Sequence, residues 1–599
     1  MQKWKKEIEF YLQMKKNVIV LEGNIYDKYL FEGVLFNLKE YIIQGILVEG
    51  NRTEESDIYI YDVLNGFRDV KGSEVSIDDL GKKYNIKNIR RVPNQPEVVV
   101  ASRIIKEVLS KKREVTDDNT EFVMEDKDSV KDIFIVDYSS RICLASSNVS
   151  QDEREVFMNL LDGCINMRED KKIIFLVDKI EDFPEWFVKN NILLKNIVIP
   201  KPDKEARKEY ISIHSDIGEN KKIDIIKKTE GMYLEDIEAI VECCKREEEK
   251  LSVQDVIFAY KYGIKENPWK DINLKEVQKT LYARVKGQDK VIDGVMKVLK
   301  NAVLGFSGSQ HSSAGMPKGI LFFAGATGTG KTETAKAIAE GIFGDETQYI
   351  RFDMSEYREQ NSDQKLFGAP PGYVGYEAGG QLTNAMKEKP FSVLLFDEVD
   401  KASPTIMDKF LQILEDGRMT DGRGNTVSFS ETIIIFTSNE GIYKKNRHEN
   451  GERIPTIPNG IVKSIEHEKI ILEELKKSFR PELFARIGED NCLVFHNIDE
   501  NAAIEILMNK NFKNFEETYK YILLDDSFKN NIKNMLHENW KEVCTENGRG
   551  VGRFFEKNVS KKISSSIFDC LNKDKKIMDD VEKVLVKENE VHIVYKKGI

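Results

Sequence analysis

The stretch GATGTGKT at residues 325–332 decides the fold of the second half of the chain. It matches the phosphate-binding pattern G-x-x-x-x-G-K-[ST] without a gap. The apolar run 319–324 before it predicts a buried strand, and residues 332–343 after it predict a helix that ends at Gly344. Strand, glycine-rich loop and helix in this order are the context in which the motif binds a nucleotide. We therefore expect an α/β domain with a nucleotide site.

The residue types of this loop predict how it would hold ATP. Backbone N–H groups of such a loop converge on the phosphates, and the helix that follows adds the positive end of its dipole. Lys331 is predicted to reach the β- and γ-phosphates, and the Thr332 hydroxyl is predicted to bind Mg²⁺. A chance glycine-rich turn is the alternative, and the flanking strand and helix argue against it. The predicted nucleotide contacts in this segment are Gly325, Thr327, Gly328, Thr329, Gly330, Lys331, Thr332 and Glu333.

Two further strand candidates end in polar residues that suit hydrolysis. The run 392–396 leads to Asp397, a predicted ligand of the Mg²⁺ shell, and to Glu398, the predicted base that orients and polarises the attacking water. An acidic pair at a strand end is often only solvated, but the phosphate loop upstream favours the catalytic interpretation. The run 432–437 leads to Asn439, whose amide is a candidate for holding the γ-phosphate or the water.

The whole chain has 599 residues and a formal net charge of −11. Its length allows about four structural units. Pro268, in the stretch ENPW at 266–269, disfavours helix at the residue before it and predicts a linker there. On the N-terminal side, the strand candidates 17–21, 133–136 and 173–177 also alternate with helical patterns. We therefore predict an α/β protein with two units, each with a mainly parallel sheet and a mostly helical appendage.

Composition excludes several classes of protein. No apolar run approaches the ~18 residues of a membrane span, and residues 1–12 alternate charged and apolar residues unlike a secretion signal. The excess of 102 Asp and Glu over 91 Lys and Arg argues against general attraction to nucleic acid. The seven cysteines include no Cys-x-x-Cys spacing, which fits free thiols in a reducing compartment. We expect a cytoplasmic protein without nucleic-acid or membrane partners.

Residues from about 275 to 599 resemble the second ATPase module of the Clp unfoldases, which are AAA+ ATPases. The phrases that carry the resemblance are RVKGQD at 284–289, the phosphate loop, GAPPGYVGY at 368–376, LQILEDGRMTDG at 411–422, TSN at 437–439 and FRPE at 479–482. Several roles follow from the resemblance alone. It implies that Val285 and Lys286 pack the adenine, Asn439 is sensor 1, Arg486 is the finger that acts on the adjacent subunit, and Arg553 is sensor 2. At sensor 2 the family usually reads Gly-Ala-Arg, and this chain reads Val-Gly-Arg at 551–553, which keeps the arginine in place.

The same resemblance implies a substrate. In the family, the loop that contains Tyr373 and Val374 projects into the central pore of a hexamer and grips an extended polypeptide. A rigid aromatic flanked by glycines suits this task, because it contacts any backbone with little sequence preference. No Ile-Gly-Phe or Ile-Gly-Leu tripeptide follows sensor 1, so no ClpP-type peptidase is expected as a partner.

The first half resembles an AAA module that has lost its catalytic residues. Residues 197–207 and 229–240 are similar to the small domain of other AAA modules. However, no Gly-Lys-[Ser/Thr] occurs before residue 265, and the chain reads EGNIYD at 22–27 where the loop is expected. Hydrolysis is therefore not expected there. We interpret this half as a degenerate AAA module with a scaffolding, ring-forming or regulatory role, and an unrelated α/β domain is the alternative.

These predictions combine into one architecture. We predict a degenerate AAA large domain at 1–196, a small helical domain at 197–268, a Clp-type large domain at 269–492 and a C-terminal small domain at 493–599. The predicted function is an ATP- and Mg²⁺-dependent protein-remodelling motor that acts as a homo-hexamer. The alternative is a nucleotide-gated partner-binding or signalling ATPase without processive threading. A nucleic-acid motor is a third hypothesis, disfavoured because the chain lacks a basic, aromatic-rich groove.

Overall fold

The computed structural model forms two compact units, residues 1–265 and 266–599, and each is described by itself. Both are built on mainly parallel sheets with helices on their faces, which confirms the predicted fold class. The division into four domains stays a prediction. The described residues are 3–13, 17–44, 57–86, 95–111, 132–142, 150–189, 191–214, 216–246, 252–264, 267–306, 315–359, 361–370, 373, 376–422, 424–445, 453–457, 460–574, 576–588 and 590–596.

The sheet of the first unit has the strand order β5-β4-β6-β7-β1-β8. Neighbouring strands are parallel except at the edge, where β4 and β5 are antiparallel. The predicted strands at 17–21, 133–136 and 173–177 are therefore confirmed, with their ends shifted by one or two residues. The strands are β1 (Val18–Gly23), β4 (Asp57–Asp62), β5 (Gly66–Arg68), β6 (Asp132–Val136), β7 (Lys171–Val177) and β8 (Leu194–Ile199).

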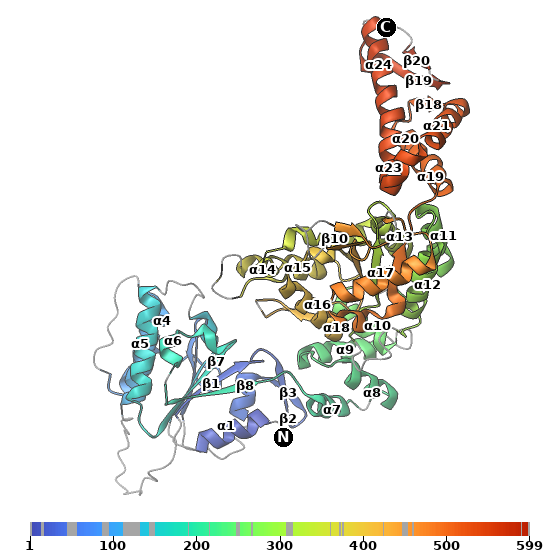
Figure 1. Ribbon diagram of the computed structural model, residues 1–599. Helices are drawn as coiled ribbons and strands as arrows, with labels where there is room; N and C mark the ends of the chain where they lie inside the picture. The colour runs from blue at the N-terminus through green and yellow to red at the C-terminus, as the bar shows by residue number, and fades with distance from the viewer. Residues whose placement is uncertain are drawn as a thin grey trace, which may run out of the picture. The chain divides into compact units, whose positions relative to one another are not determined.

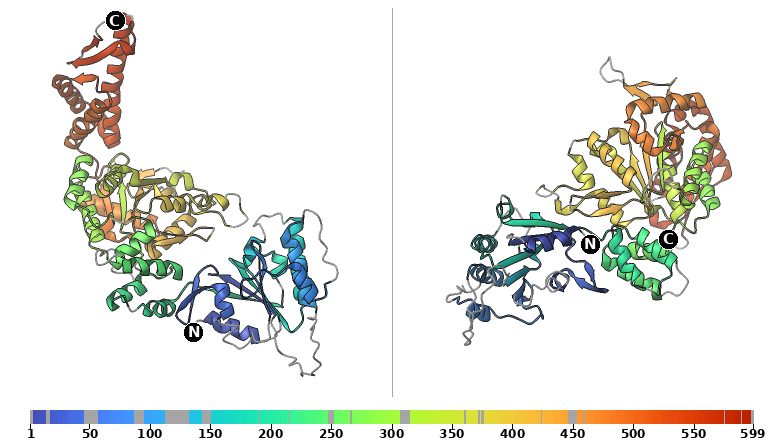
Figure 2. Two further views of the ribbon diagram at one scale, coloured as in Figure 1. Left: turned by 180° about the vertical axis from the view of Figure 1, so that it is seen from behind. Right: turned by 90° about the horizontal axis from the view of Figure 1, so that it is seen from below.

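Alternate residues of these strands enter two separate cores. Val18 and Val20 of β1 pack with helices α4 (Glu97–Ser110) and α5 (Gln151–Ile165). Ile19 and Leu21 pack on the opposite face with helix α1 (Lys3–Gln13). The two faces are covered in each view of this unit (Figures 1 and 2). Burial on both faces explains why the strands read as continuous apolar runs.

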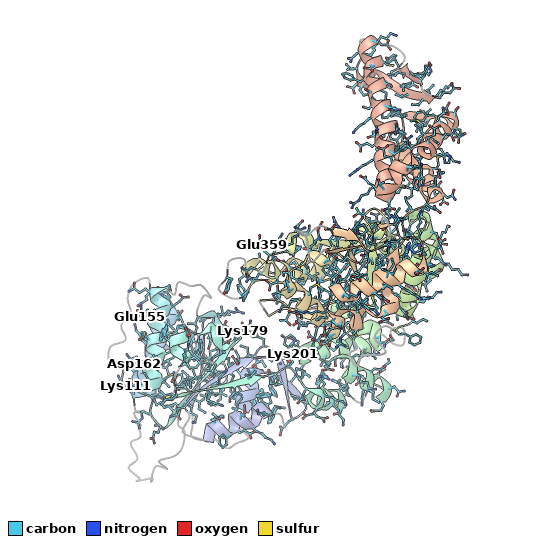
Figure 3. All side chains as sticks on the ribbon, viewed as in Figure 1. Lys111, Glu155, Asp162, Lys179, Lys201 and Glu359 are labelled. Atoms are coloured by element: carbon cyan, nitrogen blue, oxygen red, sulfur yellow. The ribbon has the colours of Figure 1, made fainter. Side chains whose placement is uncertain are left out.

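Ion pairs connect helices α4 and α5, which cover one face of this sheet. Glu155 and Asp162, labelled in Figure 3, both belong to α5. Asp162 pairs with Lys106 of α4 at 2.5 Å, and Glu155 pairs with Arg103 of α4. Glu107 in the last turn of α4 pairs with Lys111, the residue directly after this helix, at 3.0 Å. The pairs are partly exposed, so each contributes at most about 1 kcal/mol. The apolar core, rather than these pairs, holds α4 and α5 against the sheet.

A hairpin separates the first strand of this sheet from the next helix. It consists of β2 (Lys28–Phe31) and β3 (Val34–Asn37), and it leads into α2 (Leu38–Tyr41). The rest of the unit is a helical bundle with its own apolar core, against which Leu30 and Leu35 of the hairpin pack. The bundle consists of α7 (Lys204–Ser212), α8 (Glu219–Lys228), α9 (Leu234–Arg246) and α10 (Val253–Tyr262), and two short helices lie earlier in the unit, α3 (Ile77–Lys83) and α6 (Glu185–Val188).

The second unit contains a fully parallel sheet with the order β10-β11-β14-β9-β17. The predicted strands at 319–324, 392–396 and 432–437 are confirmed as three adjacent strands of this sheet, within one residue at their ends. Because the strands are parallel, the polar residues at their carboxyl ends meet at one edge. The strands are β9 (Gly319–Gly325), β10 (Tyr349–Asp353), β11 (Val393–Asp397), β14 (Ile433–Ser438) and β17 (Cys492–Phe495).

Helices cover both faces of this sheet (Figure 1). Phe352, Phe396 and Phe436 stack side by side on one face, with ring centroids 5.7 and 5.5 Å apart. The helices packed over these rings are α14 (Ser362–Phe367), α15 (Gln381–Glu388), α16 (Pro404–Asp416), α17 (Ile465–Ser478) and α18 (Pro481–Ile487). The other face carries α11 (Leu274–Arg284), α12 (Asp289–Val303) and α13 (Lys331–Phe343), and two short ribbons pair β12 (Arg418–Thr420) with β13 (Thr426–Ser428) and β15 (Tyr443–Lys445) with β16 (Arg453–Pro455).

The C-terminal part of this unit has a separate apolar core. Its strands β19 (Val581–Lys587) and β20 (Glu590–Tyr595) are antiparallel and form a hairpin. Strand β18 (Ile522–Leu524) joins β19 in parallel. The helices are α19 (Glu500–Ile506), α20 (Lys513–Thr518), α21 (Asp526–Glu538), α22 (Trp540–Val543), α23 (Asn547–Phe555) and α24 (Lys561–Asp574). Across the described ranges, we find no helix with the length and apolar character needed to cross a bilayer.

Candidate nucleotide site in the second unit

The phosphate loop lies between β9 and α13, as the sequence predicted. Gly328 and Gly330 have φ angles of 81° and 108°, a region that side chains with a Cβ rarely adopt. A Cβ on Gly328 would lie 2.5 Å from the carbonyl oxygen of Glu546, so this position also has no room for a side chain. The loop therefore brings its backbone close to the start of α23, and α13 begins at Lys331 with its N-terminus facing the same space.

Lys331 is buried at the centre of this space. Its Nζ donates to the carbonyl oxygens of Gly325 at 2.6 Å and Ala326 at 3.1 Å, and to Oδ1 of Asn439 at 2.9 Å. Burial lowers the pKa of Lys331 to about 8. These three acceptors are neutral oxygens, so a phosphate oxygen could replace them and give the ammonium group a charged partner.

The acidic pair ends strand β11. One carboxylate oxygen of Asp397 accepts from Arg351, at 2.9 Å from Nε and 2.7 Å from Nη2, and the other accepts from the Thr437 hydroxyl. Glu398 has a φ of 54°, in the left-handed region that is strained for residues with a side chain. Its backbone N–H donates to Oγ1 of Thr437 at 3.0 Å. Thr437 therefore fixes both members of the pair relative to β14.

The structure brings most of the predicted nucleotide residues to one cavity of about 500 Å³. Gly325 lies just behind the lining and bonds Lys331 through its carbonyl oxygen. The predicted residues that line the cavity are Val285, Lys286, Thr327, Gly328, Thr329, Gly330, Lys331, Thr332, Glu333, Asp397, Glu398 and Asn439. Residues that the sequence did not predict also line it, among them Arg284, Arg351, Lys510, Asn511 and Arg549.

Arg553 does not reach this cavity. Its guanidinium pairs with Glu546 at 2.5 Å, and its side chain is 71% exposed. Arg549, one turn earlier on α23, lines the cavity instead, close enough to Lys331 to lower that lysine's pKa by charge repulsion. The helix starts at Asn547, and its first turn contacts the phosphate loop, where the Gly548 N–H donates to the Gly328 carbonyl at 3.0 Å. The sequence signal for Arg549 is its place directly after Asn-Gly at the start of the helix.

Arg486 also lies away from the cavity of its own chain. It sits in the last turn of α18 and pairs with Glu415 of α16. It lines a different hollow of about 410 Å³, together with Lys297 of α12 and Phe306. Its action on a neighbouring subunit stays a prediction.

The aromatic residue of the predicted pore loop is accessible. Tyr373 lies between α14 and α15, and it is 61% exposed. Its N–H donates to the Pro370 carbonyl at 3.3 Å, and its own carbonyl accepts from the Tyr376 N–H at 3.2 Å. Val374 lies outside the described residues, and its predicted role stays a prediction.

The site is suited to bind Mg²⁺ only when a nucleotide supplies some of the ligands. Within the described residues, no group of three or more His, Cys, Asp or Glu side chains is placed to hold a metal ion. Thr332 and Asp397 nevertheless line the same cavity, and Asp397 already holds a cation, the guanidinium of Arg351. One hydroxyl and one carboxylate suit Mg²⁺, which is usually bound through few protein ligands plus substrate phosphates and water.

Comparison with known proteins relates both halves of the chain to AAA+ proteins. The family described as "AAA domain (Cdc48 subfamily)" matches residues 316–490. The family described as "AAA+ chaperone, N-terminal Rossmann-like domain" matches residues 3–200. The second match relates the first half to AAA+ chaperones, in agreement with the resemblance seen in its sequence rather than with an unrelated α/β domain.

The curated relatives are Clp proteins. The negative regulator of genetic competence ClpC/MecB of Bacillus subtilis is 32% identical over 463 residues, which cover 73% of this chain and 54% of the relative. The chaperone protein ClpB of Oceanobacillus iheyensis is 42% identical over 236 residues, 39% of this chain and 28% of the relative. ClpC of Staphylococcus aureus is 39% identical over 270 residues, 43% of this chain and 31% of the relative. The chain thus spans about half the length of these relatives or less.

The fold is also found in solved structures. A closed-state structure of Hsp104 with ATPγS and FITC-casein matches 98% of this chain and 94% of that chain, with a TM-score of 0.65 and 20% identity. An extended Saccharomyces cerevisiae Hsp104–casein complex matches 98% and 95%, with a TM-score of 0.65 and 19% identity. At this identity, the match establishes the fold of tandem AAA+ modules.

Proposed function

We propose that the protein is an ATP-driven protein-remodelling motor. Along the chain, a match to an AAA+ chaperone N-terminal domain is followed by a match to an AAA domain, and the relatives are Clp proteins. One observation carries the proposal. A single cavity collects a phosphate loop, a buried lysine, an acidic pair in a strained turn, a polar amide and an arginine from the C-terminal part. These are the groups that phosphoryl transfer to water requires.

The binding step uses the loop and the cations around it. The backbone of residues 327–330, the N-terminus of α13 and the Lys331 ammonium receive the phosphates. Val285 and Lys286 stand at the side of the cavity where we place the adenine. Thr332 and Asp397 would hold Mg²⁺, which supplies charge neutralisation on the phosphate oxygens. When Asp397 binds Mg²⁺, Arg351 would lose its ion pair with Asp397. It would keep the ion pair with Asp353, which lies 2.9 Å from Nη2 of Arg351.

The hydrolytic step uses the strained turn at the end of β11. Glu398 orients the attacking water and accepts its proton, and Thr437 holds the backbone of Glu398 in place. Asn439 positions the water or the γ-phosphate. Arg549 offers a positive charge from the first turn of α23, in the role that the sequence assigned to Arg553. Because α23 belongs to the C-terminal part, hydrolysis and product release would change the position of that part.

Assembly would complete the site. Arg486 cannot act on the nucleotide of its own chain from its position beside Glu415. We propose that it reaches the cavity of the next subunit in a homo-hexameric ring, where an arginine supplied in trans is worth about 10³–10⁵ in rate. ATPase activity should then depend on assembly. We place hydrolysis in the second unit alone, because the first lacks the lysine-bearing loop and the base.

The substrate would be a polypeptide drawn past Tyr373. Tyr373 is exposed, and it lies between α14 and α15, two helices that pack on the ATPase sheet and through which movements at the site would be transmitted. We expect no ClpP-type peptidase, nucleic acid or membrane as a partner, and we expect the protein to work in the cytoplasm.

Substitution of the exposed tyrosine tests the proposal. Tyr373→Ala should keep basal ATPase activity and lose most of the unfolding of a tagged fluorescent substrate, because the ring is exposed and its removal disturbs little packing. Tyr373→Phe keeps the aromatic face and should retain unfolding. An Ala variant that unfolds substrate at the wild-type rate would contradict the pore role. Wild-type protein that hydrolyses ATP but unfolds no substrate would favour the nucleotide-gated signalling alternative.

A further inference from the structure

The first unit places a β-hairpin where the second places its phosphate loop. In the second unit, β9 ends at Gly325 and α13 begins at Lys331, so only the five loop residues 326–330 separate strand and helix. In the first unit, β1 ends at Gly23, and β2 and β3 intervene before α2 begins at Leu38. Asn37 caps α2 by accepting from the Glu40 N–H, and Glu40 in turn accepts from the Asn37 N–H. The helix N-terminus is therefore satisfied by protein groups instead of being open to an anion.

Asp27, at the start of this hairpin, bridges to the helical bundle. It is 3% exposed, and its two carboxylate oxygens accept from the backbone N–H groups of Leu234 at 2.9 Å and Glu235 at 3.0 Å. Asn24 and the Lys28 N–H donate to the same carboxylate at 2.9 and 2.8 Å. Leu234 and Glu235 are the first residues of α9, so the negative charge sits at the positive end of a 13-residue helix. The geometry is that of a phosphate at a helix N-terminus, with a side chain in place of the ligand.

Further contacts fasten the same hairpin to the same helix. Lys28 pairs with Glu238 of α9, and this partner raises the pKa of Lys28. Leu30 and Leu35 pack on the core of the bundle. The carboxylate of Asp27 is therefore the centre of a joint that also has an ion pair and apolar contacts.

The surrounding cavity has the wrong charge for a nucleotide. It measures about 510 Å³, close to the cavity of the second unit, and it lies against the hairpin and α7. Five carboxylate-bearing residues line it, against two lysines. The cavity of the second unit reverses this balance, with six cationic and three acidic residues. The residues concerned in the first unit are Asp27, Glu32, Asp203, Glu205 and Glu209, with Lys5 and Lys28.

We propose that Asp27 is a built-in substitute for nucleotide phosphate, which locks the helical bundle of the first unit to its sheet in one nucleotide-independent arrangement. The first unit then serves as a fixed platform. Nucleotide-driven movement between a sheet and its helical part arises only in the second unit, where the start of α23 meets the phosphate loop through Gly548 and Arg549.

Hydrogen exchange on the full chain tests the lock. In the wild type, protection of the first turns of α9 should be the same with no nucleotide, with Mg²⁺–ADP and with Mg²⁺–ATPγS. Asp27→Ala should lower this protection about tenfold or more, because two backbone N–H groups lose a charged acceptor. Asp27→Asn keeps the shape and one acceptor, and it should lie between the two. Unchanged protection of α9 in both variants would overturn the proposal.

A matched control comes from Asp203, which caps α7 in the same bundle through the Ala206 N–H at 2.8 Å. Asp203→Ala should lower protection at α7 and leave α9 unchanged. If Asp203→Ala exposes α9 as much as Asp27→Ala does, the effect is general loosening of the bundle and the lock is refuted.

The number of nucleotides bound per wild-type chain is a second test, and it does not depend on whether the Asp27 variants fold. Equilibrium dialysis of the wild-type chain with Mg²⁺–ATPγS should give one nucleotide per chain, lost in Lys331→Ala. Two nucleotides per wild-type chain, or one that survives Lys331→Ala and increases the protection of α9, would overturn the proposal. A chain that binds none contradicts the proposed motor function and agrees with the lock.

Discussion

The two units end the corresponding strand of their sheets in the same backbone turn with different chemistry. Strand β11 leads to Asp397 and Glu398, and β6 leads to Asp137 and Tyr138. Glu398 and Tyr138 have φ angles of 54° and 51°, and a 3₁₀ turn follows each. Strain at this position is usually maintained for function. In the first unit, the same strained conformation is found although tyrosine stands where the second unit has its predicted catalytic base. We therefore infer that the fold itself imposes this turn.

The aspartates of the two units have different cationic partners. Asp137 pairs with Lys39 of α2 at 3.0 Å, and Asp397 pairs with Arg351 of the neighbouring strand β10. Lys39 lies in the first turn of the helix after β1, where Lys331 lies in the helix after β9. In the second unit, the corresponding lysine contacts neutral acceptors, so it can exchange them for phosphate. In the first unit, the charges of Lys39 and Asp137 neutralise each other, so this lysine is not poised to bind a phosphate at the sheet edge.

The largest expected effect comes from replacing Glu398, the residue in the strained turn of the second unit. Glu398→Gln should lower kcat for ATP by about 10²–10⁴, because the variant keeps the shape but cannot accept a proton. The Kd for ATP should stay within a few-fold of the wild type. Steady-state phosphate release and binding of a fluorescent ATP analogue measure the two quantities. The matched change in the first unit, Tyr138→Phe, should leave both unchanged.

Comparable hydrolysis by Glu398→Gln would refute its assignment as the base. A large loss in Tyr138→Phe would mean that the first unit takes part in catalysis, and the contrast between the two strand ends would then fail.

A second test separates two arginines on one helix. Arg549→Ala should lower kcat/KM for ATP by about tenfold to a hundredfold, which corresponds to the ~1.5–3 kcal/mol of a charge-assisted hydrogen bond. Arg553→Ala should have little effect, because its side chain is largely exposed and pairs with Glu546 outside the cavity. Steady-state ATPase kinetics of the two variants measure the difference. The reverse result would support the sensor 2 role that the resemblance implies for Arg553.

The smallest expected effect concerns pH. In the nucleotide-free protein, Lys331 loses its proton as the pH rises through about 8, whereas an unfolded lysine keeps it to about 10.5. Phosphate binding requires the ammonium form, so ATP affinity should fall by up to about tenfold between pH 8 and 9. By the same linkage, the nucleotide-free fold should gain stability from this lysine between pH 8 and 10.5, since the unfolded state binds more protons there.

Titration of a fluorescent ATP analogue at several pH values measures this effect. Lys331→Arg keeps its charge over the whole range and should give a flatter profile. Equal slopes for lysine and arginine would mean that another group controls the pH dependence.

Local sequence predicted most of the second unit. The phosphate loop, the acidic pair and the strands before them are contiguous segments, whose apolar runs and glycines specify strand, turn and helix directly. Their convergence also followed, because parallel strands end at one edge of a sheet. The clustering of Lys331, Asp397, Glu398 and Asn439 in one cavity agrees with that reasoning. Their catalytic roles stay predictions.

The helix that supplies the second-unit arginine was harder to predict. Arg549 and Arg553 are one helical turn apart on α23, so periodicity places them on the same face of the helix. Only the depth at which the helix N-terminus approaches Gly328 decides which of the two reaches the phosphate loop.

The sequence by itself determined that the first unit lacks a phosphate loop and that the second has one, because each is a property of a few adjacent residues. The tertiary structure alone decided what replaced it. Asp27 and Leu234 are 207 positions apart, and their contact depends on how a hairpin and a helical bundle pack. Long-range contacts of this kind leave no local pattern in the chain, since they are fixed by the summed packing of apolar cores rather than by the propensities of neighbouring residues.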